Sequence, residues 1–151
     1  MGIEDQIKTS RFQDGWHKAI INILFTNNWL SNVLEDRASK KCITLQQFNV
    51  LRILRGQYPN PASNATIRER MISSTPDISR LIERIVAKGL VTRTKNKADK
   101  RAVDLLITEK GLQLLDELEA DMNLSTMLSE NISEDEAQLL SNLLDKLRGE
   151  A

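Results

Sequence analysis

The residues with the clearest chemical potential are cations gathered in one short segment. The run KNKADKR at 95–101 places four of them around a single acid, Asp99: Lys95, Lys97, Lys100 and Arg101. Ammonium and guanidinium groups at this density can bind phosphates or other polyanions. The simpler alternative is a solvated turn, and the flanking elements decide between the two.

No other group of residues has the composition of a catalytic or metal site. His17 is the only histidine and Cys42 the only cysteine, so neither a nucleophilic triad nor a metal-ligand set can be built. A glycine-rich phosphate loop is also missing. The sequence therefore predicts neither an enzyme nor a cofactor. Lys40 and Lys41 are the only sequence neighbours of Cys42 that could make its thiol more reactive. A buried or inert thiol is therefore the favoured interpretation.

The composition is that of a globular protein with an uneven charge distribution. Hydrophobic residues make up 40% and charged residues 28% of the chain, and the formal net charge is zero. Residues 64–111 contain 11 Lys and Arg against 6 Asp and Glu, whereas residues 112–151 contain 2 against 10. A basic section beside an acidic one favours a polyanionic partner, with ordinary surface variation as the alternative.

The cellular setting follows from what the chain lacks. No apolar run reaches the roughly 18 residues of a membrane span. The first residues are acidic and have no apolar core, so they do not form a secretory signal. A lone cysteine cannot form an intramolecular disulfide. We therefore expect a cytoplasmic protein with no membrane partner.

Hydrophobic spacing predicts a long first helix over residues 12–37 that is apolar on two sides. Two apolar faces are more than one core requires, so this helix is expected to pack against a second chain as well. Thr44 and Gln47 form a capping box for a helix that stops near Gly56. The prolines of the segment 58–64 predict a loop, after which Ser63 or Asn64 caps a short helix to about residue 72.

The next helix is predicted over residues 75–88, about three residues further on. Thr75 is expected to cap it, with Pro76 at the first helical position and Asp77 in the first turn. Gly89 is expected to end it in the left-handed conformation. Two short helices with so short a turn have helix-turn-helix spacing.

Two strand-like runs follow, at 90–94 and 103–107, and the basic segment lies between them. Thr108 then caps a helix predicted to reach about residue 127, and Ser133 with Glu136 caps a final leucine-rich helix. The fold class is therefore mainly α with a small β-hairpin. It is a winged helix-turn-helix flanked by N- and C-terminal helices that are expected to form a dimer, the usual solution for surplus apolar faces.

In this fold the second helix of the motif enters the major groove of DNA with its N-terminal residues at the bases. The predicted contacts on this helix are Thr75, Asp77, Ser79, Arg80 and Arg84. Arg80 could bind guanine, and Arg84 is placed for a phosphate. The wing cations are expected to reach phosphates or the minor groove. Asp99 is expected to pair with Arg93 or Arg101 and to brace the wing.

Three segments together resemble the MarR family of bacterial winged-helix transcription regulators. They are 80-RLIERIVAKGLVTR-93, the wing motif Asp99-x-Arg101, and 105-LLITEKG-111. The resemblance implies a homodimeric repressor-type regulator with one domain over 1–151, a DNA-binding lobe at 44–111 and dimerisation helices at 11–38 and 112–148. It also implies a pseudo-palindromic operator and insertion of Arg101 into the minor groove, with Asp99 helping to hold it.

The family resemblance further implies release of DNA on binding a small aromatic or lipophilic molecule, or on oxidation of a cysteine. The candidate pocket residues are Trp16, His17, Trp29 and Phe48, and ordinary core packing is the alternative for each. Cys42 lies beyond the first helix, whereas the oxidation-sensing branch carries its cysteine near the start of that helix. A peroxide-sensing role is therefore not transferred. The alternative function is a winged-helix module that binds an acidic protein.

Overall fold

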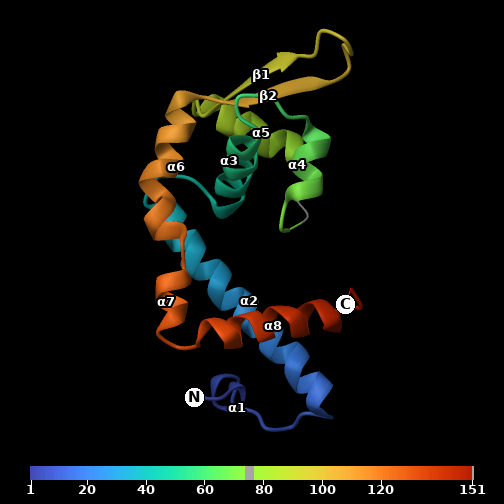
Figure 1. The fold of residues 1–151 in the computed structure, drawn as a ribbon, viewed down its shortest axis with the longest axis vertical. Helices are drawn as coiled ribbons and strands as arrows, with labels where there is room; N and C mark the ends of the chain where they lie inside the picture. The colour runs from blue at the N-terminus through green and yellow to red at the C-terminus, as the bar shows by residue number, and fades with distance from the viewer. Residues whose placement is uncertain (74–76, 151) are drawn as a thin grey trace. The chain divides into compact units, whose positions relative to one another are not determined.

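The computed structural model describes residues 1–73 and 77–150, and it has the mainly helical fold with one hairpin that the sequence predicts (Figure 1). The elements are α1 (Ile3–Gln6), α2 (Gly15–Ser39), α3 (Leu45–Gln57), α4 (Asn64–Arg70), α5 (Ile78–Ala87), β1 (Val91–Lys95), β2 (Val103–Ile107), α6 (Glu109–Met122), α7 (Ser125–Ser129) and α8 (Glu134–Leu147). Helices α4 and α5 form the helix-turn-helix, and β1 and β2 form the wing. None of the helices in the described ranges is both long and apolar enough to cross a bilayer.

Short polar side chains set most helix starts, as the sequence predicts. Thr44 and Gln47 form the capping box of α3, and Ser133 and Glu136 form that of α8. Ser63 accepts a hydrogen bond from the backbone of Thr66 and so caps α4. Each cap satisfies N–H groups that the first turn of a helix leaves without partners.

Some elements differ from prediction. Helix α1 was not expected, and α2 begins at Gly15 because the Asp14 carboxylate accepts the backbone N–H of His17 at 2.7 Å. The predicted helix from residue 108 to about 127 is divided into α6 and α7. The break follows Met122, where the Asn123 side chain accepts the backbone N–H of Ser125 at 3.0 Å and forms a local turn instead of a further helical one.

The chain forms two compact units, Met1–Leu118 and a second that begins at Glu119. The core of the first unit is built from α3, α4, α5, the wing and α6. Its largest fully buried side chains come from all five: Leu51, Leu54, Ile67, Ile82, Ile85, Leu105, Ile107, Leu115 and Leu118. The helix-turn-helix and the wing therefore share one core, which fixes them relative to each other.

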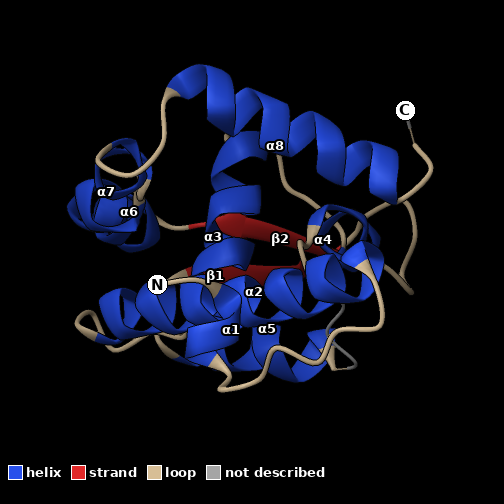
Figure 2. Cartoon of the chain, turned by 90° about the horizontal axis from the view of Figure 1, so that it is seen from below, coloured by secondary structure: helices blue, strands red, loops and turns tan. Residues whose placement is uncertain are grey.

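The wing is a two-stranded antiparallel hairpin whose register runs from Val91 opposite Ile107 to Lys95 opposite Val103 (Figure 2). The loop between α3 and α4 joins it through Ala62, which exchanges two backbone hydrogen bonds with Leu105 at 2.8 and 2.9 Å. The base of the wing is thus tied to the helices, whereas its tip extends beyond them.

Gly111 lets α6 pack closely on the base of the wing. A Cβ atom at this position would lie 2.5 Å from the carbonyl oxygen of Leu90 and 2.6 Å from a side-chain carbon of Ile107. Thr108 fixes the same corner, since its hydroxyl donates to the Gly89 carbonyl at 2.8 Å and accepts the Gly111 N–H at 3.1 Å. The Thr-x-x-Gly start of α6 is therefore required by packing as well as by capping.

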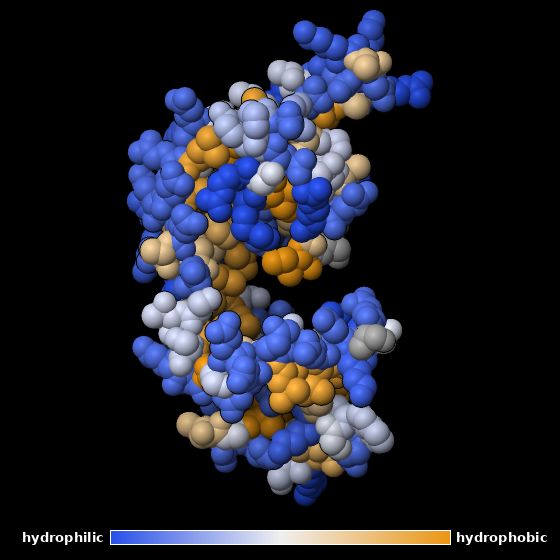
Figure 3. Space-filling model, in the orientation of Figure 1, coloured by the Kyte–Doolittle hydropathy of each residue, from blue (hydrophilic) through white to orange (hydrophobic). Residues whose placement is uncertain are grey.

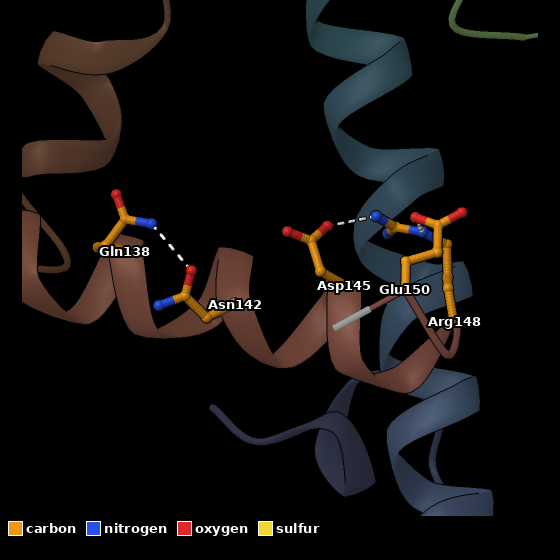
Figure 4. A network of polar contacts seen from close by, with 5 residues as sticks. All are labelled: Gln138, Asn142, Asp145, Arg148 and Glu150. Carbon is orange, nitrogen blue, oxygen red and sulfur yellow. Dashed lines mark hydrogen bonds and ion pairs between the residues drawn. The ribbon is translucent and has the colours of Figure 1, made fainter.

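In the second unit, α8 has one polar face and one apolar face. Gln138 donates to Asn142 at 3.0 Å, and the Arg148 guanidinium contacts both Asp145 and Glu150 (Figure 4). The hydrogen bonds to Glu150 and Asp145 raise the pKa of Arg148. The other face exposes four leucines, which form the orange patch over α8 in Figure 3: Leu139, Leu140, Leu143 and Leu147.

Candidate nucleic-acid interface

Helix α5 presents a polar face to solvent because its apolar face is fully used by the core. Ile78, Leu81, Ile82 and Ile85 are buried at the helical spacing of three and four. The positions between them are exposed, and these include Ser79, Arg80, Glu83 and Arg84. Neither guanidinium has an ion-pair partner within residues 1–73 and 77–150. Both are therefore available to bind an external anion.

The start of α5 differs from the sequence prediction. Asp77 is its N-cap, and its carboxylate accepts the backbone N–H of Arg80 at 2.9 Å. The predicted cap Thr75 and the predicted first helical residue Pro76 lie outside the described residues, and the helix begins at Ile78. Asp77 was expected within the first turn. A carboxylate engaged with the helix backbone is a capping group, which leaves it less suited to contact a base edge.

The end of α5 is as predicted. Gly89 has φ +75°, its N–H donates to Val86, and the Leu90 N–H donates to Ile85. This pair of bonds is a Schellman motif, and the buried Leu90 side chain provides its apolar contact. The chain thus turns directly from the recognition helix into β1, so the wing follows α5 with no spacer.

The tip of the wing is organised by Asn96, a residue that the sequence reasoning did not single out. Its side-chain oxygen accepts the N–H groups of Ala98 and Asp99, both at 2.9 Å, and its amide nitrogen donates to Asp104 at 3.0 Å. Its backbone N–H donates to the Ala102 carbonyl at 3.0 Å. Asn side chains commonly accept backbone N–H groups two or three residues further on and so form such turns. The Asn-x-x-Asp spacing at 96–99 is the sequence signal that could have predicted this one.

Asp99 makes a different contact from the predicted one. No ion pair joins it to Arg93 or Arg101 in the part of the chain that the structure describes. Its carboxylate instead accepts the backbone N–H of Arg101 at 3.0 Å, and its carbonyl accepts the Ala102 N–H at 3.0 Å. Asp99 therefore holds the backbone of Arg101 and leaves the guanidinium unengaged.

The four wing cations lie on the exposed, hydrophilic end of the hairpin, which extends as the blue projection at the top of Figure 3. All four side chains are exposed: Lys95, Lys97, Lys100 and Arg101. The structure thus places two groups of cations on one compact unit, one on α5 and one on the wing. A rod-like polyanion could contact both groups.

None of the four residues predicted to line a ligand pocket lines either of the two cavities described in the next paragraph. Trp16 is 80% exposed and Trp29 41% exposed, and 13 residues of helix separate them, which is about 20 Å. His17 and Phe48 are half-buried. His17 accepts the backbone N–H of Gln13 at 3.1 Å and so acts within the start of α2.

Two cavities among the described residues lie in the first unit. One, of about 430 Å³, lies between α2, α3 and α5 and has a largely polar lining that includes Glu35, Gln47 and Arg84. The other, of about 600 Å³, is lined by Cys42 among other residues. Cys42 lies in the turn between α2 and α3 with φ +59°, and it is exposed. Of the two alternatives for this thiol, buried or inert, exposure contradicts only the first. No three His, Cys, Asp or Glu side chains among the described residues are placed to hold a metal ion.

Comparison with known proteins supports the same reading of the fold. The MarR family model matches residues 43–103, which span α3, both helices of the motif and most of the wing. Among solved structures, a mutant MarR from E. coli complexed with operator DNA is 25% identical, with a TM-score of 0.76, and the match covers 89% of this chain and 99% of that one.

Two further structures extend the match. The apo form of wild-type MarR from E. coli is 27% identical, with a TM-score of 0.67 over 83% of this chain and 93% of that one. A MarR transcription factor from Planctomyces limnophilus is 28% identical, with a TM-score of 0.62 over 91% and 95%. The winged helix-turn-helix, the exposed cations and the family match on the same residues together support a transcription regulator of the MarR family.

Proposed function

We propose that the protein is a homodimeric regulator that binds a pseudo-palindromic DNA operator through α5 and the wing. The observation that carries this proposal is the pairing of two exposed cation groups on one rigid core, Arg80 and Arg84 on α5 and the cations of 95–101 on the wing. The operator complex of the E. coli protein with the same fold supports it. The family assignment makes this chain a regulator and not an enzyme.

Each group has a distinct role in the proposed complex. Arg80 lies in the first turn of α5, where its forked guanidinium can donate to guanine O6 and N7. Ser79 beside it can form a hydrogen bond with a base edge or with the DNA backbone. Arg84 lies one turn later and contacts a phosphate. On the wing, Arg101 enters the minor groove and the three lysines contact phosphates. Asp99 fixes the loop from which Arg101 extends.

The dimer is supported by large apolar side chains that stay exposed to solvent. On α2 these are Trp16, Ile20, Leu24, Phe25 and Trp29, and on α8 they are Leu139, Leu140, Leu143 and Leu147. Apolar patches of this kind mark interaction surfaces, and a closed twofold homodimer is the commonest way to cover them. Two recognition helices would then meet half-sites about 10 base pairs apart.

Control of this binding by a small aromatic or lipophilic molecule stays a prediction. The cavity between α2, α3 and α5 supports it by position, since Leu81 and Arg84 of the recognition helix line it. Its polar lining suits a hydrogen-bonding molecule better than a purely lipophilic one.

Fluorescence anisotropy with DNA flanking the protein's own coding region tests the proposal. Specific affinity should exceed that for random duplex and should fall linearly in a log–log plot against salt, because bound phosphates release counterions. Arg101→Ala should weaken binding and reduce the salt slope by about one unit. Arg80→Ala should reduce discrimination between operator and mismatched operator by about 1–3 kcal/mol.

A matched control is Lys146→Ala, which removes one exposed cation from α8 and should leave affinity unchanged. Equal affinity for all duplexes, with no effect of either arginine, would contradict the proposal. It would favour instead a winged helix that binds an acidic protein.

Sedimentation velocity tests the dimer separately. The double variant Leu139→Glu/Leu143→Glu places two charges on the apolar face of α8 and should convert the dimer to a monomer. Ser141→Glu, which adds a charge at an exposed polar position of the same helix, should not. A wild-type protein that sediments as a monomer at micromolar concentration would refute the dimer.

A further inference from the structure

The cavity beside Cys42 has the features of an anion-binding site. It has a volume of about 600 Å³ and lies where the turn between α2 and α3 meets the end of α5 and the first half of α6. This volume is within the usual range of small-molecule sites. Its lining consists of Lys41, Cys42, Ile43, Ala87, Lys88, Leu90, Lys110, Gln113, Leu114 and Glu117.

The lining combines positive charge with an apolar wall. Three lysines come from three different elements, and Glu117 is the only acid, which gives the lining a formal charge of +2. The turn between α2 and α3 contributes Lys41, the C-cap of α5 is Lys88, and α6 contributes Lys110. Ile43 and Leu90 are buried, and they form the apolar wall together with Leu114.

The lysines keep donor capacity for a ligand. Lys88 uses two of its three donors, to the Cys42 carbonyl at 2.6 Å and to Gln47 at 3.0 Å, and Lys110 uses one, to the Lys88 carbonyl at 2.8 Å. Lys41 pairs with Glu117 at 3.1 Å, with both side chains more than 40% exposed. An ion pair so open to solvent is weak, and a ligand anion can replace it.

We propose that this cavity binds a small phosphate monoester whose organic part is apolar. A phosphate monoester carries a charge of about −1.5 to −2 near neutral pH, which matches the +2 of the lining. Ammonium groups bind phosphate as point charges and need no fixed geometry, so three lysines from separate elements suit it. The wall of Ile43, Leu90 and Leu114 receives the apolar part.

Such a ligand would act on the recognition helix through Lys88. This residue ends α5, and its ammonium ties that end to the turn at Cys42 and to Gln47 of α3. A phosphate that draws the ammonium into the cavity competes with both ties. The position of α5 on α3 then depends on the ligand. This regulatory part of the inference rests on the proposed DNA-binding function.

Cys42 gives a direct test of binding that needs no DNA. It is the only cysteine, it is exposed, and it lines the cavity, so an uncharged maleimide reports access to the site. Phenyl phosphate should slow the labelling in a saturable way with a Kd below about 1 mM. Inorganic phosphate should bind more weakly and phenol should have no effect. If phenyl phosphate at up to about ten times 1 mM leaves the rate of Cys42 labelling unchanged, the proposed site is wrong.

Lysine variants test the charge requirement. Lys41→Gln/Lys110→Gln removes two of the three ammoniums and should raise the Kd for phenyl phosphate at least about tenfold. Lys40→Gln removes the neighbouring exposed cation that does not line the cavity and should leave the Kd unchanged. If the double variant melts early, Lys41→Gln alone should raise the Kd in the same direction. A Kd equal to that of the wild type in a folded variant would refute the assignment.

Operator affinity in the presence and absence of phenyl phosphate tests the link to α5. A change in affinity for wild-type protein that Lys41→Gln/Lys110→Gln abolishes supports the link. Saturation of the cavity with no change in affinity contradicts it. If the protein binds no DNA specifically, the maleimide assay still decides whether the cavity is a site, so the two failures are distinguishable.

Discussion

The recognition helix and the wing both present exposed cations, but different forces hold them in place. Helix α5 is positioned by four buried side chains that belong to the common core. The tip of the wing has no buried residue between Thr92 and Arg101, and its shape comes from hydrogen bonds that Asn96 and Asp99 make with their near neighbours.

This difference has a consequence for function. A base-reading helix must hold its side chains to a fraction of an ångström, and a packed core provides that rigidity. A wing that contacts phosphates and a groove needs only a defined loop, because such contacts tolerate small displacements. Substitutions in the two regions should therefore fail in different ways, by loss of stability in α5 and by loss of DNA affinity alone in the wing.

The largest effect should come from Ile82→Ala in α5. This side chain is 1% exposed at the centre of the core, and its truncation leaves a cavity. We expect a loss of about 2–5 kcal/mol in the free energy of unfolding, measured by urea denaturation. Ser79→Ala, on the exposed face of the same helix, should change stability by less than about 0.5 kcal/mol. Similar losses for both would show that the core does not position α5.

Gly111→Ala should affect the base of the wing. The added Cβ would overlap the Leu90 carbonyl, which cannot move freely because it accepts the Thr108 N–H at 3.0 Å. A loss of about 1–3 kcal/mol in unfolding free energy is expected from this overpacking. Gly56→Ala is the control, since nothing lies within 4 Å of its added Cβ. A melting temperature unchanged by Gly111→Ala would rule out the close packing of α6 on the wing.

Substitutions of Asp77 distinguish a helix-capping role of its carboxylate from a contact with a DNA base. Asp77→Ala removes the acceptor for the Arg80 N–H and should reduce stability by about 0.5–2 kcal/mol. Asp77→Asn should restore most of that stability, because an amide oxygen caps nearly as well. Thermal melts measure both. Base preference that changes in Asp77→Asn while stability is kept would indicate that the carboxylate also reads the DNA.

The smallest effect on stability should come from Asn96→Ala at the tip of the wing. Its side chain makes three hydrogen bonds in an exposed or half-buried setting, so we expect a change below about 1 kcal/mol in unfolding free energy. DNA affinity should nevertheless fall, with a smaller salt slope, because the loop that carries Arg101 loses its shape. Full affinity in this variant would mean that the wing does not need a defined loop.

Local sequence signals were sufficient for most of the fold. The capping boxes at Thr44 and Ser133, the Schellman end at Gly89 and the alternation of the strands concern residues within a few positions of each other. Their energetics are local, so their positions are readable from the chain. The same signals identified the helix-turn-helix, the wing and its cations.

The errors arose where local signals competed. Thr75, Pro76 and Asp77 each have a typical role at a helix start, and the structure assigns the cap to Asp77. Asn123 ended α6 although the apolar spacing continued beyond it. Asp99 had both side-chain and backbone partners within reach, and it bonds to the backbone. When several nearby residues could form the same cap or hydrogen bond, the sequence does not tell which one does, because small differences in geometry decide.

The sequence by itself determined the order of the main elements, the caps of α3, α4 and α8, and the division of charge between the basic section and the acidic one. Only the tertiary structure decided which groups meet in space. It placed Lys41, Lys88 and Lys110 around one cavity, left Cys42 exposed at its edge and pressed Gly111 against Leu90. The residues around this cavity are up to 76 positions apart in the chain, from Lys41 to Glu117. These contacts depend on the packing of a shared core, which no local pattern encodes.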